Sequence, residues 1–137
     1  MKKRNFLPLR ISVMVVSDTR KEKTDTSGKI LVERLTKAGH LLVEKSIVPD
    51  DVYQIRSVLS KWIADPAVEI VITSGGTGLT GRDSTPEAAS ALFDKEIEGF
   101  GELFRWLSYE DIATSTIQSR VTAGVANGTY IFCLPGS

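Results

Sequence analysis

The stretch from Val68 to Glu87, VEIVITSGGTGLTGRDSTPE, constrains the fold more than any other part of the chain. Its first residues, Val68 to Thr73, form an apolar, β-branched run that is typical of a buried strand. Three of the next five residues, Ser74 to Gly78, are glycines, which a strand interior tolerates poorly because glycine packs nothing and costs backbone entropy. The residues Ser84 to Glu87 then combine two hydroxyls, a proline and an acid, as a helix start does. A strand, a glycine loop and a helix N-terminus in this order form the anion-binding arrangement of open α/β sheets.

Two generic nucleotide motifs fit the glycine loop in part. Gly76, Gly78 and Gly81 have the G-x-G-x-x-G spacing of dinucleotide sites, but the helix starts later, and no acid closes a next strand about 20 residues on. The P-loop spacing also fits, except that Arg82-Asp83 stands where a lysine and a hydroxyl are required. An aspartate there repels a bare phosphate unless a metal intervenes. A plain glycine turn between a strand and a helix is the third interpretation.

The composition is that of an ordinary globular protein. A chain of 137 residues is long enough for a single domain, residues 1–137, with its own core. Lys plus Arg and Asp plus Glu each number 17, so no global field favours nucleic acid or an anionic membrane, and no apolar run nears transmembrane length. The single cysteine, Cys133, excludes an internal disulfide and suits a reducing compartment. We therefore expect a cytoplasmic protein without nucleic-acid or membrane partners.

Strand-like and helix-like segments alternate along the chain. Apolar runs predict strands at 10–16, 41–48, 68–73 and 129–134. Helical spacing of apolar residues predicts helices after Asp25 and after Asp51, and at 87–94 and 99–109. This alternation predicts an α/β fold, a three-layer α/β/α domain with a mostly parallel sheet between its helices.

Polar residues follow the predicted strands and form the candidate site. Ser17 and Asp18 follow the first strand, Asp50 the second and Pro135 the last, while the glycine loop follows the third. Because the carboxyl ends of parallel strands meet at one edge, we expect these groups to converge. A turn or cap cluster is the alternative for Ser17 and Asp18, and at least one of Asp50 and Asp51 should cap the next helix.

Several of these motifs resemble those of a known family. The segment TSGGTGLTGRDSTPEA resembles the central motif of the MoaB/Mog family of molybdenum-cofactor biosynthesis proteins, which are related to the G domain of gephyrin, and is closest to MoaB. The motifs VVSD, DTSG, Pro49-Asp50 and LPGS extend the resemblance over nearly the whole chain. It implies the fold of that family and a homotrimer, for which the stripe Phe100 and Phe104, with Trp106 beside it, is a candidate contact. Family members usually carry a further helix after the LPGS loop, and whether this protein is shorter or the sequence ends before that helix stays open.

The resemblance implies a molybdopterin adenylyltransferase. In the family, the terminal phosphate of molybdopterin attacks the α-phosphate of ATP, which yields adenylylated molybdopterin and pyrophosphate. Asp50 and Asp83 match the two functional acids of the family, and we expect them to be catalytic and to bind Mg²⁺. Carboxylates cannot neutralise anionic reactants directly, but they can hold a cation between them. ATP is then the co-substrate.

The expected substrate-binding residues lie at the strand ends, in the glycine loop, at the following helix start and in the last loop. They are Ser17, Asp18, Ser74, Gly75, Gly76, Thr77, Gly78, Arg82, Thr85, Pro86, Glu87, Ser119, Pro135, Gly136 and Ser137. Ser119, with Arg120 beside it, best matches the segment that lines the substrate site in the family. Arg82 either adds positive charge to the site or pairs with a nearby acid.

A protein without catalytic activity is the alternative function. Some MoaB-type members lack one or both acids, and such a protein would bind molybdopterin or act as a partner of other enzymes in the pathway. The presence of both Asp50 and Asp83 favours the enzyme. A plain NTPase is a weaker hypothesis because the P-loop lysine is missing.

Overall fold

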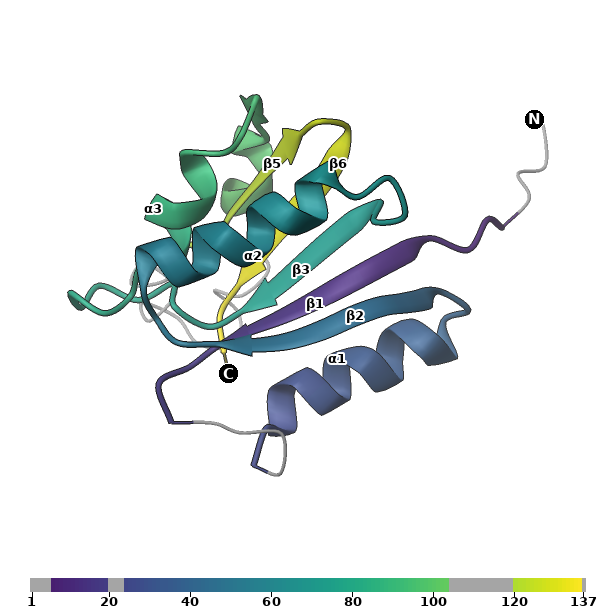
Figure 1. Ribbon diagram of the computed structural model, residues 1–137, viewed down its shortest axis with the longest axis horizontal. Coiled ribbons are helices and arrows are strands. Elements are labelled where there is room, and N and C mark those ends of the chain that lie inside the picture. The colour runs from purple at the N-terminus through teal and green to yellow at the C-terminus, as the bar shows by residue number, and fades with distance from the viewer. Residues whose placement is uncertain (1–5, 20–23, 104–119, 137) are drawn as a thin grey trace.

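The computed structural model of the chain describes residues 6–19, 24–103 and 120–136. Within them, six strands form one sheet in the order β2-β1-β3-β6-β5-β4. The strands are β1 (Arg10–Val16), β2 (Leu41–Val48), β3 (Ile70–Ser74), β4 (Lys95–Glu96), β5 (Thr122–Ala126) and β6 (Thr129–Leu134). The neighbours β2, β1, β3 and β6 run parallel, whereas β5 and β4 add an antiparallel edge (Figure 1). The predicted α/β fold with a mostly parallel sheet is confirmed, and the antiparallel edge is an addition to it.

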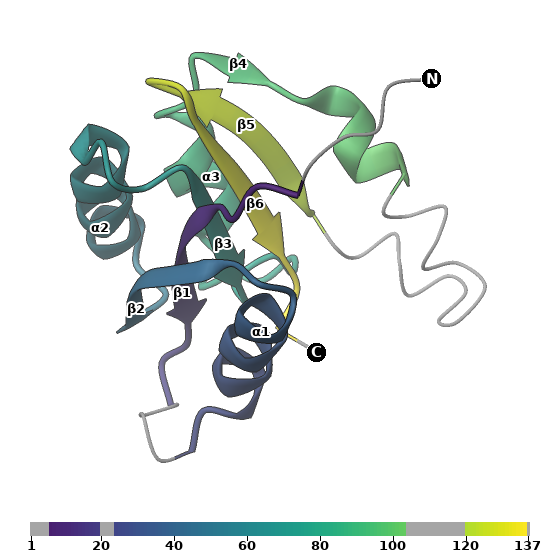
Figure 2. The same ribbon diagram turned by 90° about the vertical axis from the view of Figure 1, so that its right-hand side faces the viewer.

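Helices cover both faces of the sheet. They are α1 (Thr26–Lys37), α2 (Val52–Ala64) and α3 (Thr85–Ser90), and a further helix covers 98–103. The helices α2 and α3 pack on one face and α1 packs on the other (Figure 2). None of the helices in the described part of the chain has the length and apolar character needed to cross a bilayer. The candidate trimer residues Phe104 and Trp106 lie outside the described residues, while Phe100 packs edge-on against Phe132 with 5.4 Å between ring centroids.

The segment after α3 departs from the sequence prediction. The helix was expected to reach Asp94, but it ends at Ser90. Leu92 and Phe93 instead turn onto the core beneath α2 and α3. The Asp94 amide donates to the Val125 carbonyl at 2.8 Å, which begins the pairing of β4 with β5. Burial of these two apolar side chains therefore outweighs local helix propensity.

Most of the core lies between the sheet and the α2/α3 layer. Met14 and Val71 from the sheet and Ile55, Leu59 and Trp62 from α2 are completely buried there. The cluster beneath α1 is smaller, with Ile11, Val13 and Leu35 as its buried members. Cys133 is buried, and burial raises the pKa of its thiol to about 11, which keeps it unreactive at neutral pH.

A buried ion pair fixes the start of α1. The Asp25 carboxylate accepts a hydrogen bond from the Gly28 amide at 2.9 Å and lies 2.7 Å from the Lys45 ammonium on β2. Burial pushes the pKa of Asp25 upward, but the Lys45 ammonium and the Gly28 amide outweigh it, so the pKa lies below its ordinary value. A side chain at Gly28 would overlap the Asp25 carboxylate. The DTSG motif is therefore a helix cap joined to the neighbouring strand.

Candidate functional site

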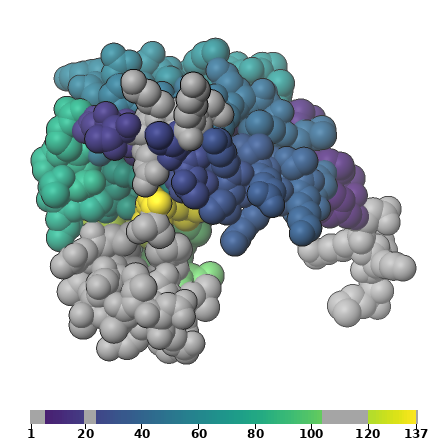
Figure 3. All heavy atoms as spheres, turned by 90° about the horizontal axis from the view of Figure 1, so that it is seen from below, coloured from purple at the N-terminus to yellow at the C-terminus, as the bar shows by residue number. Residues whose placement is uncertain are grey.

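The carboxyl ends of β1, β2, β3 and β6 meet at one edge of the sheet, as expected. The Ser17 amide donates to the Val48 carbonyl, and the Gly75 amide donates to the Leu134 carbonyl, both at 2.9 Å. The Ser74 hydroxyl lies 3.4 Å from the Pro135 carbonyl oxygen. Seen from this edge, the yellow end of β6 lies between the blue atoms of α1 and the teal-green atoms of the segment after β3 (Figure 3). The structure thus brings together residues that are far apart in sequence.

The glycine loop needs its first two glycines for steric reasons. Gly75 and Gly76 have φ values of +100° and +73°, where L-residues with a side chain are strained. A Cβ on Gly75 would also collide with the Val16 carbonyl oxygen, and one on Gly76 would collide with the Thr85 hydroxyl. Thr85 in turn holds the loop, because its hydroxyl donates to Gly75 O at 2.9 Å and its amide to Gly76 O at 3.1 Å.

Two consecutive amides of this loop are available to a ligand. Within the residues that the structure describes, the N–H groups of Gly76 and Thr77 donate no hydrogen bond. Successive amides after residues with positive φ form a concave anion-binding surface. Pro86 and Glu87 follow in the first turn of α3, beside this loop. The geometry is that of a site for an anionic group such as a phosphate.

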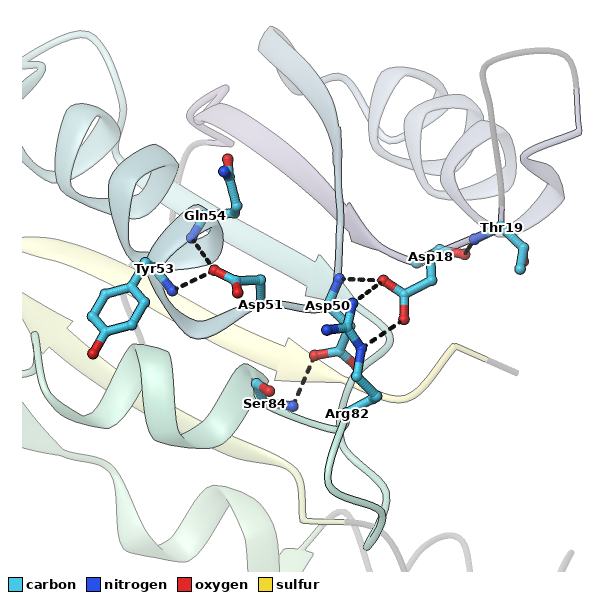
Figure 4. Close-up of polar contacts among 9 residues, drawn as sticks. Asp18, Thr19, Asp50, Asp51, Tyr53, Gln54, Arg82 and Ser84 are labelled. Atoms are coloured by element: carbon cyan, nitrogen blue, oxygen red, sulfur yellow. Dashed lines mark hydrogen bonds and ion pairs between the residues drawn. The ribbon is translucent and has the colours of Figure 1, made fainter.

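Asp50 faces the segment that follows the glycines and does not cap α2. Its carboxylate, in a residue that is only 7% exposed, accepts a hydrogen bond from the Ser84 amide at 2.8 Å. The neighbouring Asp51 performs the capping, since it accepts from the amides of Tyr53 and Gln54 at 2.9 and 3.0 Å (Figure 4). Burial raises the pKa of Asp50, and the nearby carboxylates of Asp83 and Asp18 raise it further. The Ser84 hydrogen bonds only partly offset this rise.

Asp18 and Arg82 form a two-point ion pair across the site. The Arg82 guanidinium donates from Nη2 to Asp18 Oδ1 at 2.6 Å and from Nε to Asp18 Oδ2 at 3.0 Å (Figure 4). The same Oδ1 accepts the Asp50 amide at 3.0 Å. Hydrogen bonding to Arg82 holds the pKa of Asp18 below its ordinary value. Of the two roles considered for Arg82, the structure contains the pairing with a nearby acid.

Asp83 is turned into its own loop. Its Oδ2 accepts from both the hydroxyl and the amide of Thr80, at 2.7 and 2.8 Å. These bonds hold the pKa of Asp83 below its ordinary value. The charge of Asp83 lies close enough to Asp50 to raise the pKa of Asp50. In the part of the chain that the structure describes, no three His, Cys, Asp or Glu side chains are arranged to hold a metal ion.

Arg120, which stands beside Ser119 in the segment expected to line the substrate site, holds the glycine loop, a role that the sequence did not predict. Its amide donates to Thr77 O at 2.7 Å, its Nε donates to Gly78 O at 2.7 Å, and its Nη2 donates to Asp83 O at 2.5 Å. It also forms an ion pair with Glu87, which lowers the pKa of that carboxyl. No local pattern marks this role, because Arg120 lies 33 residues from Glu87 in the chain. The predicted site residues Ser119 and Ser137 lie outside the described residues.

The chain matches the family described as a probable molybdopterin binding domain over residues 12–137. It is 54% identical to Molybdenum cofactor biosynthesis protein B of Escherichia coli (strain K12) over 132 residues, which cover 96% of this chain and 78% of that protein. The chain belongs to the MoaB/Mog family. A crystal structure of Molybdenum cofactor biosynthesis protein B has a TM-score of 0.94 at 45% identity, covering 98% of this chain and 84% of that one. The tungsten cofactor synthesizing protein MoaB from Pyrococcus furiosus has a TM-score of 0.84 at 39% identity, covering 95% and 83%.

This MoaB/Mog protein therefore has a molybdopterin-binding domain and a role in molybdenum-cofactor biosynthesis. A hollow of about 540 Å³ beside its glycine loop is large enough for a fused ring system. The predicted residues Ser17, Ser74, Gly75, Pro135 and Gly136 form one wall of this hollow. The other wall comes from α1 and was not predicted: Thr26, Ser27, Ile30, Leu31 and Arg34. A second hollow, of about 660 Å³ at the amino ends of the strands, contains none of the predicted site residues.

Proposed function

We propose that the protein is a molybdopterin adenylyltransferase. An oxygen of the terminal phosphate of molybdopterin attacks the α-phosphorus of ATP, the new P–O bond forms, and the bond to the β-phosphate oxygen breaks to release pyrophosphate. The observation that carries this proposal is the position of Asp50. Its carboxylate is buried at the edge of the sheet and faces the loop that carries Asp83. It does not cap α2, because Asp51 does so. A structural cap has no need of a buried carboxylate with a raised pKa next to two other acids, whereas a site for cations and phosphates does.

The residues around Asp50 divide the remaining work. The amides of Gly76 and Thr77 bind phosphate oxygens of one reactant. The hollow between α1 and the last loop holds a ring system, and Arg82 remains beside the phosphates through its pairing with Asp18. The nucleophile needs no histidine base, because a phosphate monoester is already ionised at neutral pH. The main tasks are therefore alignment of two anions and neutralisation of their charge.

Asp50 and Asp83 would hold the Mg²⁺ that this reaction requires. Carboxylate oxygens are ligands that Mg²⁺ prefers, and it typically takes only one or two of them together with substrate phosphates. The described residues offer no group of three acids, histidines or cysteines that could hold a metal. A pair of acids is nevertheless enough for such a site, because the substrate phosphates supply further ligands. When bound, Mg²⁺ neutralises charge on the phosphates and orients them.

The test is to incubate the protein with molybdopterin, ATP and Mg²⁺ and to measure pyrophosphate and the adenylylated pterin. We expect both products in equal amounts, and neither when any one component is left out. Pyrophosphate without adenylylated pterin would indicate a plain NTPase. Neither product, despite measurable binding of molybdopterin, would contradict the proposal.

That last outcome would support a non-catalytic molybdopterin-binding protein, either alone or as a partner of other enzymes in the pathway. One observation favours this alternative: the Asp83 carboxylate already accepts two hydrogen bonds from Thr80. A carboxylate satisfied inside its own loop can serve structure alone.

We also propose that the protein works as a homotrimer in the cytoplasm. A closed three-fold ring joins two different patches of each subunit. Sedimentation at micromolar concentration should give the mass of three chains, and a monomer under these conditions would contradict the assembly.

A further inference from the structure

Arg120 donates hydrogen bonds to three backbone carbonyls of the glycine loop. Two of them, Gly78 O and Asp83 O, accept from its guanidinium, and the third, Thr77 O, accepts from its main-chain amide. Its remaining guanidinium nitrogen pairs with the Glu87 carboxylate on α3. The arginine is only partly exposed, with a side-chain exposure of 32%. It therefore holds one side of the loop at several points along its length.

One of these carbonyls, that of Asp83, belongs to a peptide whose amide faces an acid. In a trans peptide the C=O and N–H groups point in opposite directions within one plane, and the described chain contains no cis peptide. The Asp83 carbonyl shares its peptide with the Ser84 N–H, which donates to Asp50 Oδ1 at 2.8 Å. The Thr77 carbonyl accepts from the Arg120 main-chain amide, a bond that a change of side chain leaves in place. The Arg120 guanidinium thus holds the back of the Asp83–Ser84 peptide, and Asp50 binds the front.

We propose that Arg120 is a positioning residue that sets Asp50 through the peptide Asp83–Ser84, without touching the Asp50 carboxylate. Hydrogen bonds in a chain polarise one another, so a guanidinium on the carbonyl strengthens the donation by the amide of the same peptide. It also fixes the direction of that amide. The link from Arg120 to Asp50 runs through one peptide group: guanidinium, carbonyl oxygen, amide nitrogen, carboxylate. Its consequence for turnover rests on the proposed adenylyl transfer, but the hydrogen-bond link does not.

Arg10 provides a matched control at the opposite end of the sheet. Its Nε donates to the Ala67 carbonyl at 2.8 Å, and its guanidinium pairs with Glu69 at 3.7 Å. It therefore makes the same kinds of contact as Arg120, a backbone carbonyl and an acid, but none with the glycine loop. Arg120→Ala, Arg120→Lys and Arg10→Ala are compared with the unmodified protein.

The first measurement is the amide proton resonance and hydrogen exchange of Ser84. In Arg120→Ala we expect this amide proton to shift upfield and to exchange faster, because its bond to Asp50 weakens. Arg10→Ala should leave this resonance unchanged. If Arg120→Ala does not fold, as judged by circular dichroism, Arg120→Lys is measured instead, since a single ammonium cannot hold Gly78 O and Asp83 O at once. An unchanged Ser84 amide in a folded Arg120 variant would overturn the proposal.

The second measurement is steady-state adenylylation. We expect kcat to fall about 10–100-fold in Arg120→Ala, as for residues that orient metal ligands, while the KM for molybdopterin changes less than about threefold. Added guanidinium ion at a non-denaturing concentration should restore part of the lost kcat. A raised KM at unchanged kcat would make Arg120 a ligand contact and overturn the positioning role. If the unmodified protein releases no pyrophosphate, the proposed function fails, and the Ser84 amide resonance still decides the role of Arg120.

Discussion

The junction between β2 and α2 and the loop between β3 and α3 each supply one acid to the same edge, yet they treat it differently. At the first junction, Asp51 satisfies the helix start and leaves Asp50 to accept a bond from the other segment. In the second loop, Asp83 accepts from Thr80, three residues before it. Asp50 is therefore held by distant parts of the chain, and Asp83 is held by its own.

The two acids consequently differ in the direction of their pKa shifts. Burial raises the pKa of Asp50, whereas the hydrogen bonds from Thr80 lower that of Asp83. Two aspartates with the same expected role thus differ in the free energy needed to keep them charged. Keeping Asp50 charged therefore costs free energy, and no role in the structure of its own segment explains that cost. Asp83, in contrast, also stabilises its own loop.

The largest expected effect is the loss of activity in Asp50→Ala. Because the variant removes a proposed Mg²⁺ ligand and keeps the Asp51 cap, adenylylation should fall below detection while molybdopterin binding stays measurable. Parallel measurements of pyrophosphate release and pterin binding check this. Full turnover at saturating substrate would remove Asp50 from the reaction.

Asp83→Asn should have a smaller effect on turnover. The carboxamide has a similar volume and can still accept from Thr80, so the loop should keep its shape. We expect kcat to fall on the order of 100-fold, as when one electrostatic stabiliser is lost, with little change in molybdopterin affinity. Equal losses in kcat and affinity would identify Asp83 as a ligand contact.

Substitutions of Asp50 and Asp83 should change the stability of the protein in opposite directions. Since the folded pKa of Asp50 lies above its unfolded value, the stability contributed by its protonated form is present at low pH and is lost as the pH rises through the folded pKa. Asp50→Asn should therefore raise the melting temperature at neutral pH, and its advantage should grow from about pH 4 to pH 7.

Asp83 shows the reverse linkage, because its lowered pKa contributes stability above the unfolded value that is lost as the pH falls. Asp83→Asn should therefore destabilise the protein at neutral pH, on the order of 1 kcal/mol for a weakened hydrogen bond to a charged group. Its deficit relative to the unmodified protein should shrink in acid. Thermal melts of both variants across pH check these two predictions. If both variants changed the melting temperature in the same direction at neutral pH, the contrast between Asp50 and Asp83 would be contradicted.

The smallest effect is expected at Asp51. Asp51→Ala removes the N-cap of α2 and should cost about 1 kcal/mol of unfolding free energy. Turnover at saturating substrate should persist, because the Asp50 carboxylate bonds to Ser84 and not to the helix amides. Asp51→Ser, which keeps a capping oxygen, should recover most of the stability. A loss of turnover in Asp51→Ala as large as that in Asp50→Ala would show that the two neighbours cannot be separated.

The sequence predicted the parallel part of the fold because periodic apolar runs carry that information locally. It did not predict the antiparallel edge. The strand β4 is only Lys95–Glu96, and β5 contains alanine and glycine in place of a β-branched run. Gly124 is needed there because the Phe93 ring occupies the space of its side chain. That requirement depends on tertiary packing and leaves no mark in the local pattern.

Much of the candidate site could also be predicted, since Ser17, Asp50, Ser74 and Pro135 each follow an apolar strand. The sequence could not predict which of Asp50 and Asp51 caps α2, because both residues suit that position and only the fold decides which one turns inward. The α1 wall of the hollow was missed for a related reason, and Arg120 was placed beside the substrate segment without its contacts to the glycine loop. These roles arise from contacts between segments, for which a single sequence offers no periodicity.

The contact between Gly75 and the last loop limits how this domain can evolve. A side chain on Gly136 would lie 3.5 Å from the Gly75 α-carbon, so the two loops approach each other backbone to backbone. Gly75 itself combines a positive φ with a carbonyl oxygen where its side chain would stand. In a library of all single variants, we expect variants at position 75 to be depleted under selection for folding alone, before any ligand is supplied. Adaptation to a differently shaped anion would then have to come from neighbouring residues, with the glycine backbone inherited unchanged.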